Sequence, residues 1–360
     1  MTDPESSPSR PLLDMLGGRW RVGSAVLAVA WDRRTRVAGF GLADGTVALV
    51  HPAWDGGPTV KRRDAGNVEL VPASVPVPPD ARAKAHSGTC DVIAPDPDGG
   101  FLTGGSDGRV ARVRLDGEMR ALDYFDGPVT MLAAGPGQWR ACAIRDTVHR
   151  IGGAVPRISL PGAVSALALH PAGAELAIGH PAGVTLWAGG ASPRLRPMPG
   201  QVDGLCWGGD QDTLVATTLD GLMRAWHEGQ VCDMRLENGA ACQAPLAGDG
   251  FVAGREGRLA RWLPPESAMQ PFGLRNQSSV THLAGHPRRP LMVAGYANGT
   301  VALFQPNTEG LLLILAPAEG AVSALAFSPD GDCLAVGTDD GDIGALSLPG
   351  ALFREQARRE

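Results

Sequence analysis

Residues 321–331 read Ala-Val-Ser-Ala-Leu-Ala-Phe-Ser-Pro-Asp-Gly, and this stretch decides the fold because it occurs twice. Its earlier copy, at residues 163–173, reads Ala-Val-Ser-Ala-Leu-Ala-Leu-His-Pro-Ala-Gly. Each copy is followed by a short apolar run, a turn pair that ends in Gly, and five residues of alternating polarity. The chain is therefore predicted to be an array of similar supersecondary units.

The turn pair sets the number of units. It occurs eight times, at Asp44-Gly45, Asp107-Gly108, a degenerate Asp146-Thr147, Ala182-Gly183, Asp220-Gly221, Glu256-Gly257, Asn298-Gly299 and Asp340-Gly341. Six of the seven separations lie between 36 and 42 residues, close to the ~40–45 residues of a four-stranded propeller blade. Asp-Gly and Asn-Gly favour a type I′ turn, whose twist matches the flanking strands.

A strand of alternating polarity follows each turn, and its fifth residue is always apolar. We expect the aromatic members of this position to pack between adjacent blades: Trp187, Trp226, Trp262 and Phe304. The prediction is an all-β fold, a single closed β-propeller of eight blades with four antiparallel strands each. Seven blades remain the alternative if the degenerate third unit is irregular.

Both chain ends and one long gap complete the predicted organisation. Residues 1–18 are expected to be a flexible segment, residues 19–350 the propeller, and residues 351–360 a charged tail. Residues 19–22 are expected to close the ring as the outer strand of the last blade, because an open array would leave unpaired edges. The gap of 63 residues contains a loop insertion at about residues 53–85, with an outer strand near residues 68–71.

Composition and charge exclude several classes of protein. A net charge of −6 argues against a nucleic-acid binder, which normally has a basic surface. The longest apolar run, residues 311–315, is too short to cross a membrane, and residues 1–10 do not resemble a secretion signal, so a cytoplasmic location is expected. The six cysteines include no Cys-x-x-Cys pair and are interpreted as buried thiols.

The Asp-Gly hairpins, the strands ending in Trp and the Ser-Pro-Asp-Gly turn at residues 328–331 resemble the WD40 repeat over about residues 19–350. In that family a His, a Ser or Thr, the turn Asp and a Trp form a hydrogen-bond network. This chain departs from the pattern, because no Trp-Asp dipeptide occurs and the Gly-His opening is mostly missing apart from His86-Ser87-Gly88. The resemblance implies a partial network, with blade stability resting more on apolar packing.

Three groups of polar residues require a choice between structure and function. The turn residues Asp44, Asp107, Asp220, Glu256, Asn298 and Asp340 are interpreted as structural turn positions instead of a ring of cation ligands. His282 and His286 are four residues apart on a strand and its turn, which does not favour zinc. His170 and His286 are predicted to lie at the surface. The loops containing Arg33, Arg34, Arg36, Arg288 and Arg289 are expected on one face, as a candidate basic site for a partner.

No motif for a nucleophile, a metal or a phosphate-binding loop stands in a supporting context. The resemblance implies a non-catalytic scaffold that binds one or more proteins, is monomeric by itself, and needs no cofactor or metal. An enzyme or a sugar-binding protein with a site at the channel mouth is the alternative. A third hypothesis, nucleic-acid binding through Lys61, Arg62 and Arg63, predicts strongly salt-dependent affinity.

Overall fold

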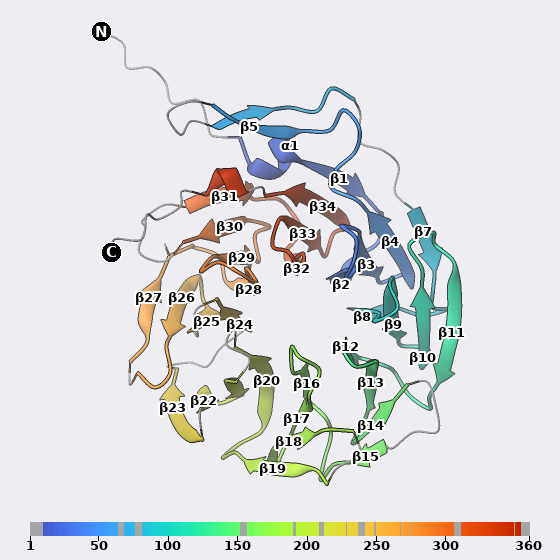
Figure 1. The fold of residues 1–360 in the computed structure, drawn as a ribbon, viewed down its shortest axis with the longest axis vertical. Helices are drawn as coiled ribbons and strands as arrows, with labels where there is room; N and C mark the ends of the chain where they lie inside the picture. Colours follow the sequence, from blue (N-terminus) through green and yellow to red (C-terminus); the bar gives the residue numbers. More distant parts are fainter. Residues whose placement is uncertain are drawn as a thin grey trace.

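The chain folds as a closed ring of β-sheets around a central channel (Figure 1). The computed structural model describes residues 10–63, 68–75, 81–151, 157–189, 192–208, 212–227, 229–236, 242–247, 250–266, 268–273, 275–305, 311–348 and 350–353. Among these residues the strands form eight four-stranded antiparallel sheets and one two-stranded sheet. The predicted eight-bladed, all-β propeller is confirmed.

The blades follow one another along the chain, and each runs from an inner strand at the channel to an outer strand at the rim. Blade 1 contains β2 (Val26–Trp31), β3 (Ala38–Leu42), β4 (Thr46–Val50) and β7 (Ala81–Lys84). Blade 2 contains β8 (Cys90–Pro95), β9 (Phe101–Gly105), β10 (Arg109–Val113) and β11 (Met119–Tyr124). Blade 3 contains β12 (Met131–Gly135), β13 (Trp139–Ile144), β14 (Thr147–Arg150) and β15 (Arg157–Ser159). Blade 4 contains β16 (Ala166–Leu169), β17 (Leu176–His180), β18 (Gly183–Trp187) and β19 (Arg194–Pro197).

The second half of the ring has the same order. Blade 5 contains β20 (Val202–Trp207), β21 (Leu214–Thr218), β22 (Leu222–His227) and β23 (Gln230–Arg235). Blade 6 contains β24 (Cys242–Leu246), β25 (Gly250–Arg255), β26 (Arg258–Trp262) and β27 (Gln270–Phe272). Blade 7 contains β28 (Val280–Gly285), β29 (Met292–Tyr296), β30 (Val301–Phe304) and β31 (Leu311–Leu315). Blade 8 contains β32 (Val322–Phe327), β33 (Cys333–Thr338), β34 (Asp342–Ser347) and β1 (Gly17–Arg21).

Burial changes from strand to strand within a blade in the way the sequence pattern requires. The second strands are buried on both faces; β3, for example, is apolar or Gly throughout and is buried at every residue. The outer strands are covered on one face only, so β11 alternates between half-buried and exposed residues. The core is therefore a series of apolar layers between neighbouring blades.

The N-terminal strand closes the ring. Strand β1 pairs antiparallel with β34, with Gly17 opposite Leu346 and Arg21 opposite Asp342. The guanidinium of Arg19 lies 3.3 Å from a carboxylate oxygen of Asp342. The eighth blade thus combines the two ends of the chain, as predicted, and β1 covers the edge of β34 that would otherwise be unpaired.

Order begins earlier in the chain than predicted. Residues 12–18, assigned above to a flexible segment, form the short helix α1 (Leu12–Leu16) and the first two residues of β1. The cause is apolar burial, because Leu12, Leu13 and Leu16 join a cluster shared by blades 7 and 8. Residues 1–9 lie outside the described part of the chain, as do residues 354–360 of the expected charged tail.

The insertion in the first unit differs from the prediction in its pairing. Strand β6 (Val68–Val71) does form where a strand was expected, but it pairs only with β5 (Thr59–Arg62). The outer strand of blade 1 is instead β7, which pairs with β4 and buries Ala83. The β5–β6 hairpin places Val60 and Leu70 against the leucine cluster of α1. Apolar contact with α1 therefore takes this hairpin away from its own blade.

The third unit is a complete blade, and the seven-blade alternative is wrong. Its degenerate turn forms without a Gly because Arg145 adopts a left-handed backbone conformation with φ 53°. After β34 the chain forms a single 3-10 turn, η2 (Gly350–Leu352), and Phe353 is buried. No helix within the described ranges is long and apolar enough to span a bilayer.

Candidate protein-binding face

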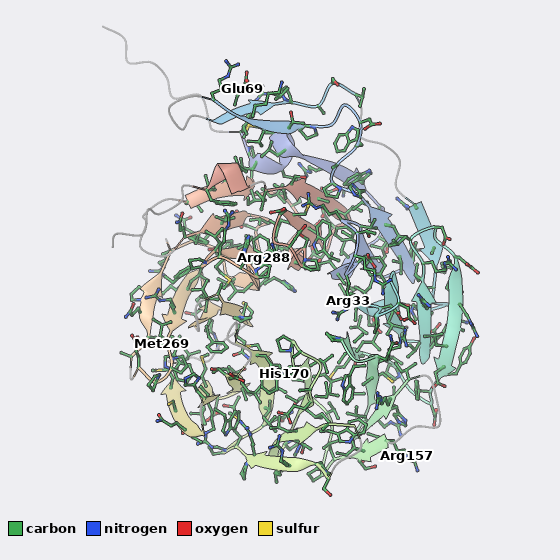
Figure 2. All side chains as sticks on the ribbon, viewed as in Figure 1. Arg33, Glu69, Arg157, His170, Met269 and Arg288 are labelled. Carbon is green, nitrogen blue, oxygen red and sulfur yellow. The ribbon has the colours of Figure 1, made fainter. Side chains whose placement is uncertain are left out.

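The loops that join the first and second strands of the blades meet at one end of the channel. We call this end the loop face and define it by residues 32–37, 96–100, 136–138, 170–175, 286–291 and 328–332. Figure 2 shows Arg33, His170 and Arg288 around the central channel. The side chains of the loop face were not expected to contact one another across so many blades, and these contacts determine what a partner would meet.

The blade 1 arginines of this face have different partners. Arg33 is half-buried and donates from Nη2 to the carbonyl oxygen of Ala134 in blade 3, at 2.8 Å. Burial lowers its pKa, although Asp32 and Asp96 oppose the shift. Arg34 is exposed and reaches the carbonyl oxygen of Pro97 at 3.3 Å.

Blade 8 separates the two predicted basic loops. The guanidinium of Arg36 lies 3.0 Å from Asp330 and 2.8 Å from Asp332, so its charge is largely neutralised. Arg289 lies over the ring of Phe353, 5.3 Å from the centroid. Arg288 is exposed and has no ion pair among the described residues. The five arginines therefore do not form one continuous basic patch, and Arg34 and Arg288 are the two that face solvent without a carboxylate.

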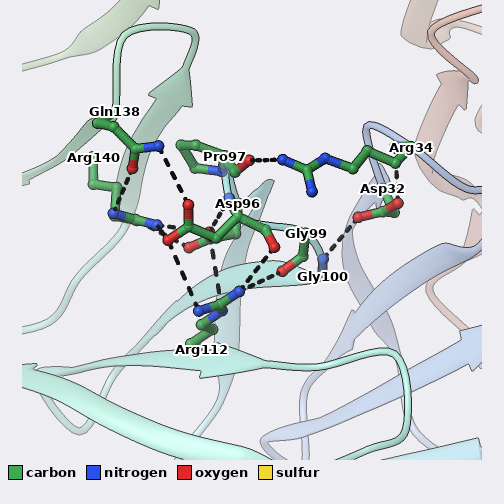
Figure 3. Close-up of polar contacts among 10 residues, drawn as sticks. Asp32, Arg34, Asp96, Pro97, Gly99, Gly100, Arg112, Gln138 and Arg140 are labelled. Carbon is green, nitrogen blue, oxygen red and sulfur yellow. Dashed lines mark hydrogen bonds and ion pairs between the residues drawn. The ribbon is translucent and has the colours of Figure 1, made fainter.

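Asp32 holds the blade 1 loop in place (Figure 3). Its side chain is buried and accepts hydrogen bonds from the backbone N–H groups of Arg34 and Thr35, at 2.9 and 2.7 Å. It also accepts one from the N–H of Gly100 in blade 2, at 2.7 Å. Burial alone would raise the pKa of Asp32, but these bonds lower it. The carboxylate remains charged and joins two loops.

Asp96 joins the next pair of blades in a similar way. It is fully buried and accepts two bonds from Arg140 of blade 3, at 3.0 and 2.8 Å. The same guanidinium lies 2.6 Å from Asp98, which lowers the pKa of that carboxyl. Hydrogen bonds with both carboxylates raise the pKa of Arg140. Buried pairs of this kind are held by geometry and are costly to break.

This framework was missed at the sequence level, although a signal was present. Asp32, Asp96, His170, His286 and Ser328 all take the first position after the inner strand of their blade. In four of them the side chain accepts a hydrogen bond from the backbone N–H of the residue two positions later, as Asp96 does from Asp98 at 2.7 Å. His286 is buried and packs against Phe327, 5.2 Å between ring centroids, so its predicted surface location was wrong. His170 is half-buried beside Trp207.

The opposite end of the channel, which we call the turn face, carries the eight turns between second and third strands. In most of them only the Gly has a positive φ, as at Gly45 with φ 82°, and its N–H bonds to the carbonyl three residues earlier. The turn of Glu256 and Gly257 is the one described case with both residues positive. The expected type I′ geometry was therefore wrong for the Asp-Gly and Asn-Gly turns, which are type I turns followed by a left-handed Gly.

The side chains of five of these turn residues accept hydrogen bonds within their own turns, and some also bond to neighbouring segments. Asp44, Asp107 and Asn298 accept the N–H of the residue two positions later, at 2.9, 3.1 and 3.2 Å. Asp220 and Asp340 each accept from a threonine hydroxyl at 2.5 Å. This leaves little reason to assign them to a shared ligand.

Part of the histidine network expected from the WD40 resemblance is present in blade 2. His86 is buried between the hydroxyl of Thr103 and the carboxylate of Asp107, at 2.9 Å from each. Burial would raise the pKa of Asp107, but the bonds from His86 and from the backbone of Ser87 and Arg109 lower it to about 2. The strand that follows ends in Val113 instead of Trp.

The predicted packing aromatics lie between blades. Trp187 meets Trp139 of blade 3 with ring centroids 5.8 Å apart, and Phe304 meets Phe272 of blade 6 at 6.4 Å. Trp226 lies under the guanidinium of Arg196 of blade 4. Trp262 is fully buried in a cluster with blade 5 residues. Each one contacts the blade before its own.

The two histidines considered above as zinc ligands bond to the backbone instead. His282 and His286 bond to different backbone groups, the carbonyl of Val322 and the N–H groups of Arg288 and Arg289. Within the described ranges no group of three or more His, Cys, Asp or Glu side chains could hold a metal ion. None of the six cysteines forms a disulfide, and burial raises the pKa of Cys206 to about 12.

Comparison with known proteins agrees with this fold. The family model "WD domain, G-beta repeat" matches residues 311–343, which run from the outer strand of blade 7 into blade 8. No curated protein matches the chain.

Solved structures match the whole ring. The WD40 domain of Sif2 is 11% identical, with a TM-score of 0.68 over 93% of this chain and 99% of that one. Sqt1 of Chaetomium thermophilum, bound to the N-terminus of ribosomal protein L10, is 14% identical, with a TM-score of 0.70 over 93% and 100%. The computationally designed Ika8 protein is 18% identical, with a TM-score of 0.69 over 93% and 99%. The chain is thus an eight-bladed β-propeller that resembles the WD40 propellers, with a recognisable WD40 repeat at the junction of its last two blades.

Proposed function

We propose that this protein is a non-catalytic scaffold that binds other proteins through the loop face. The observation that carries the proposal is the polar framework joining the loops of blades 8, 1, 2 and 3. Arg36, Asp32 and Arg140 each connect neighbouring blades there. A surface already fixed in one shape loses little conformational entropy on binding, which favours partner recognition.

The charge on this face suggests where the partner docks. Arg34 and Arg288 are exposed on opposite sides of the blade 8 loop, whose Asp330 and Asp332 are engaged by Arg36. Two exposed cations beside neutralised ones favour an acidic segment of a partner and steer its approach. Propellers resembling WD40 domains typically serve in protein interaction, and the similar Sqt1 structure holds the N-terminus of a ribosomal protein. We extend this to assembly of a cytoplasmic complex by a protein that is monomeric alone.

A paired pull-down tests the proposal. Tagged wild-type protein and the variant Arg34→Glu with Arg288→Glu are used as bait in lysate of the native organism, at low and high salt. Arg157→Glu is the matched control, because Arg157 is exposed on outer strand β15, away from the loop face. A stoichiometric protein that binds wild type and the control, but not the double variant, supports the proposal. A partner that binds all three equally moves the site off this face.

One observation favours the alternative of a small ligand in the channel. Both polar atoms of the Gln243 side chain on inner strand β24 are buried without a hydrogen-bond partner in the described part of the chain. The hydroxyls of Ser165 and Ser323, on or beside other inner strands, share this property. Buried polar groups normally have partners. A sugar that raises the melting temperature of wild type but not of Gln243→Leu would support this second function.

A further inference from the structure

The outer seam between blades 5 and 6 contains an open groove with a volume of about 720 Å³. One side is the end of β23 and the other is formed by β26 and β27 (Figure 1). Its apolar part includes Met234, Leu236, Met269 and Phe272, and Arg258 and Arg275 lie at its edges. We call it the 5/6 groove. Figure 2 shows Met269 at the outer rim, far from the loop face around the channel. The size is in the ~300–1,000 Å³ range of binding pockets.

The charge of the 5/6 groove is one-sided. Its described lining contains three arginines and no Asp or Glu. Arg258 and Arg275 are exposed, and their guanidinium groups form no ion pair or hydrogen bond with any described residue. Arg235 pairs with Asp220 at 3.3 Å, but both side chains are more than half exposed. A chain with a net charge of −6 thus presents a local cationic site on an apolar floor.

The protein itself shows what an outer seam can hold. Between blades 7 and 8 the corresponding position is filled by α1, which contacts β31, β1 and β34. Leu12, Leu13 and Leu16 of α1 are buried there, with 8%, 1% and 2% of their surface exposed. Asp14 of the same turn lies 3.6 Å from Arg19 on the outer strand. The occupant combines leucines that enter the seam with an acid that meets an arginine at its edge.

We propose that the 5/6 groove binds a short acidic, leucine-bearing helix of a partner protein. The apolar side chains of that helix contact the partly buried Met234, Leu236 and Met269, as the leucines of α1 contact blades 7 and 8. Its carboxylates pair with Arg258 and Arg275, as Asp14 pairs with Arg19. Helices that bind in grooves are recognised through apolar side chains on one face, at positions i, i+3, i+4 and i+7. This site is separate from the loop face, and the proposal does not depend on whether that face binds a protein.

A binding measurement with a defined probe tests the inference on the full chain. The probe is a fluorescein-labelled peptide that places Leu-Leu-Asp-Met-Leu, the sequence of α1, within a helical context of Glu and Ala. Two further peptides replace either its acids with Lys or its leucines with Ser. Fluorescence anisotropy gives the affinity of each for wild type, for Arg258→Glu with Arg275→Glu, for Met269→Ala, and for the control Arg157→Glu.

The expected pattern is specific to the groove. The acidic leucine peptide binds wild type at least about tenfold more tightly than the Lys or Ser versions. Reversing Arg258 and Arg275 weakens it at least about tenfold, while Arg157→Glu changes it less than about twofold. Affinity falls as salt approaches ~1 M, where the screening length is only ~3 Å.

Other results would overturn the proposal. The groove does not recognise such a helix if all three peptides bind wild type with equal affinity, or if wild type binds none of them. The same conclusion follows if Arg157→Glu weakens peptide binding as much as Arg258→Glu with Arg275→Glu does. Concentration-dependent dimerisation that Met269→Ala abolishes would assign the groove to a second copy of this chain. The two proposals can be told apart with Arg34→Glu and Arg288→Glu combined. If this double variant loses the lysate partner but still binds the peptide, the loop face and the 5/6 groove are independent sites.

Discussion

Two outer seams of the same ring differ in what fills them. Between blades 7 and 8, helix α1 buries three leucines and the β5–β6 hairpin covers it with Val60 and Leu70. Between blades 5 and 6, Met234, Leu236 and Met269 are only partly buried, and a groove of about 720 Å³ remains open. Blades are built alike, so the difference comes from segments outside the repeat.

The comparison shows how closure and recognition use the same geometry. The 7/8 seam is where the two chain ends meet, and it must be stable in the free protein because it would otherwise expose a strand edge. The 5/6 seam lies within the continuous chain and needs no such cover. A seam with no closing role can remain available for another molecule.

The largest expected effect is removal of the segment that fills the 7/8 seam. Deleting residues 1–23 removes α1 and β1, leaves β34 unpaired and exposes the leucine cluster. We expect the melting temperature to fall by more than ~10 °C, or the protein to aggregate. Differential scanning fluorimetry and light scattering measure this, with deletion of residues 1–9 as the control. An unchanged transition would refute closure by this strand.

A matched pair of truncations compares the seams directly. Leu13 is 1% exposed, and its side chain lies against Gly17 and Gly344, so Leu13→Ala creates a cavity. We expect a loss of about 2–4 kcal/mol in the free energy of unfolding. Met269→Ala in the 5/6 groove should cost less than about 1 kcal/mol. Urea unfolding checks both, and equal losses would mean that the two seams are equally packed.

The His86–Asp107 network of blade 2, away from both seams, supplies a pH-dependent reference. The pKa of Asp107 is lowered from 3.8 to about 2, so its charged form is favoured in the folded state. It therefore stabilises the fold above about pH 4, and this contribution is lost as pH falls toward 2, an effect of about 1–2 kcal/mol. Asp107→Asn should flatten that part of the pH profile measured by urea unfolding. Parallel profiles for the variant and wild type would contradict it.

The smallest expected effects concern the surface ion pairs beside the two seams. Asp14→Asn removes the 3.6 Å pair with Arg19 and should cost less than about 1 kcal/mol. Asp220→Asn removes the 3.3 Å pair with Arg235 and should likewise leave stability nearly unchanged. It should, however, increase the affinity for the acidic peptide about two- to threefold, because Arg235 no longer pairs with Asp220. Weaker peptide binding in that variant would argue against a cationic groove edge.

The repeat was accessible from sequence because it is local. Turn pairs such as Asp340-Gly341 and the alternating strands around them signal each hairpin, so the eight blades and the closing strand were predicted. The outer strand of blade 1 was not, because β7 reads Ala-Arg-Ala-Lys and has low strand propensity, whereas β6 contains Val and Leu. Contact with α1 takes β6 away from the blade and leaves β7 to pair with β4. The turn type was wrong for a similar reason, since Asp-Gly suits more than one hairpin geometry.

The candidate sites depended on contacts between blades. Sequence placed Arg33 and Arg36 on one loop, but their partners, Ala134 and Asp330, lie about a hundred and about three hundred residues further along the chain. The groove arises where three segments of two blades leave space, and no motif marks it.

The sequence by itself determined the blade number, the turn positions and the apolar layers, because hydrophobic periodicity and turn chemistry act over a few residues. Only the tertiary structure decided which arginines are neutralised, which strand closes blade 1 and which seam stays open. Those outcomes follow from charge pairing and apolar burial between residues that meet only after the ring has closed.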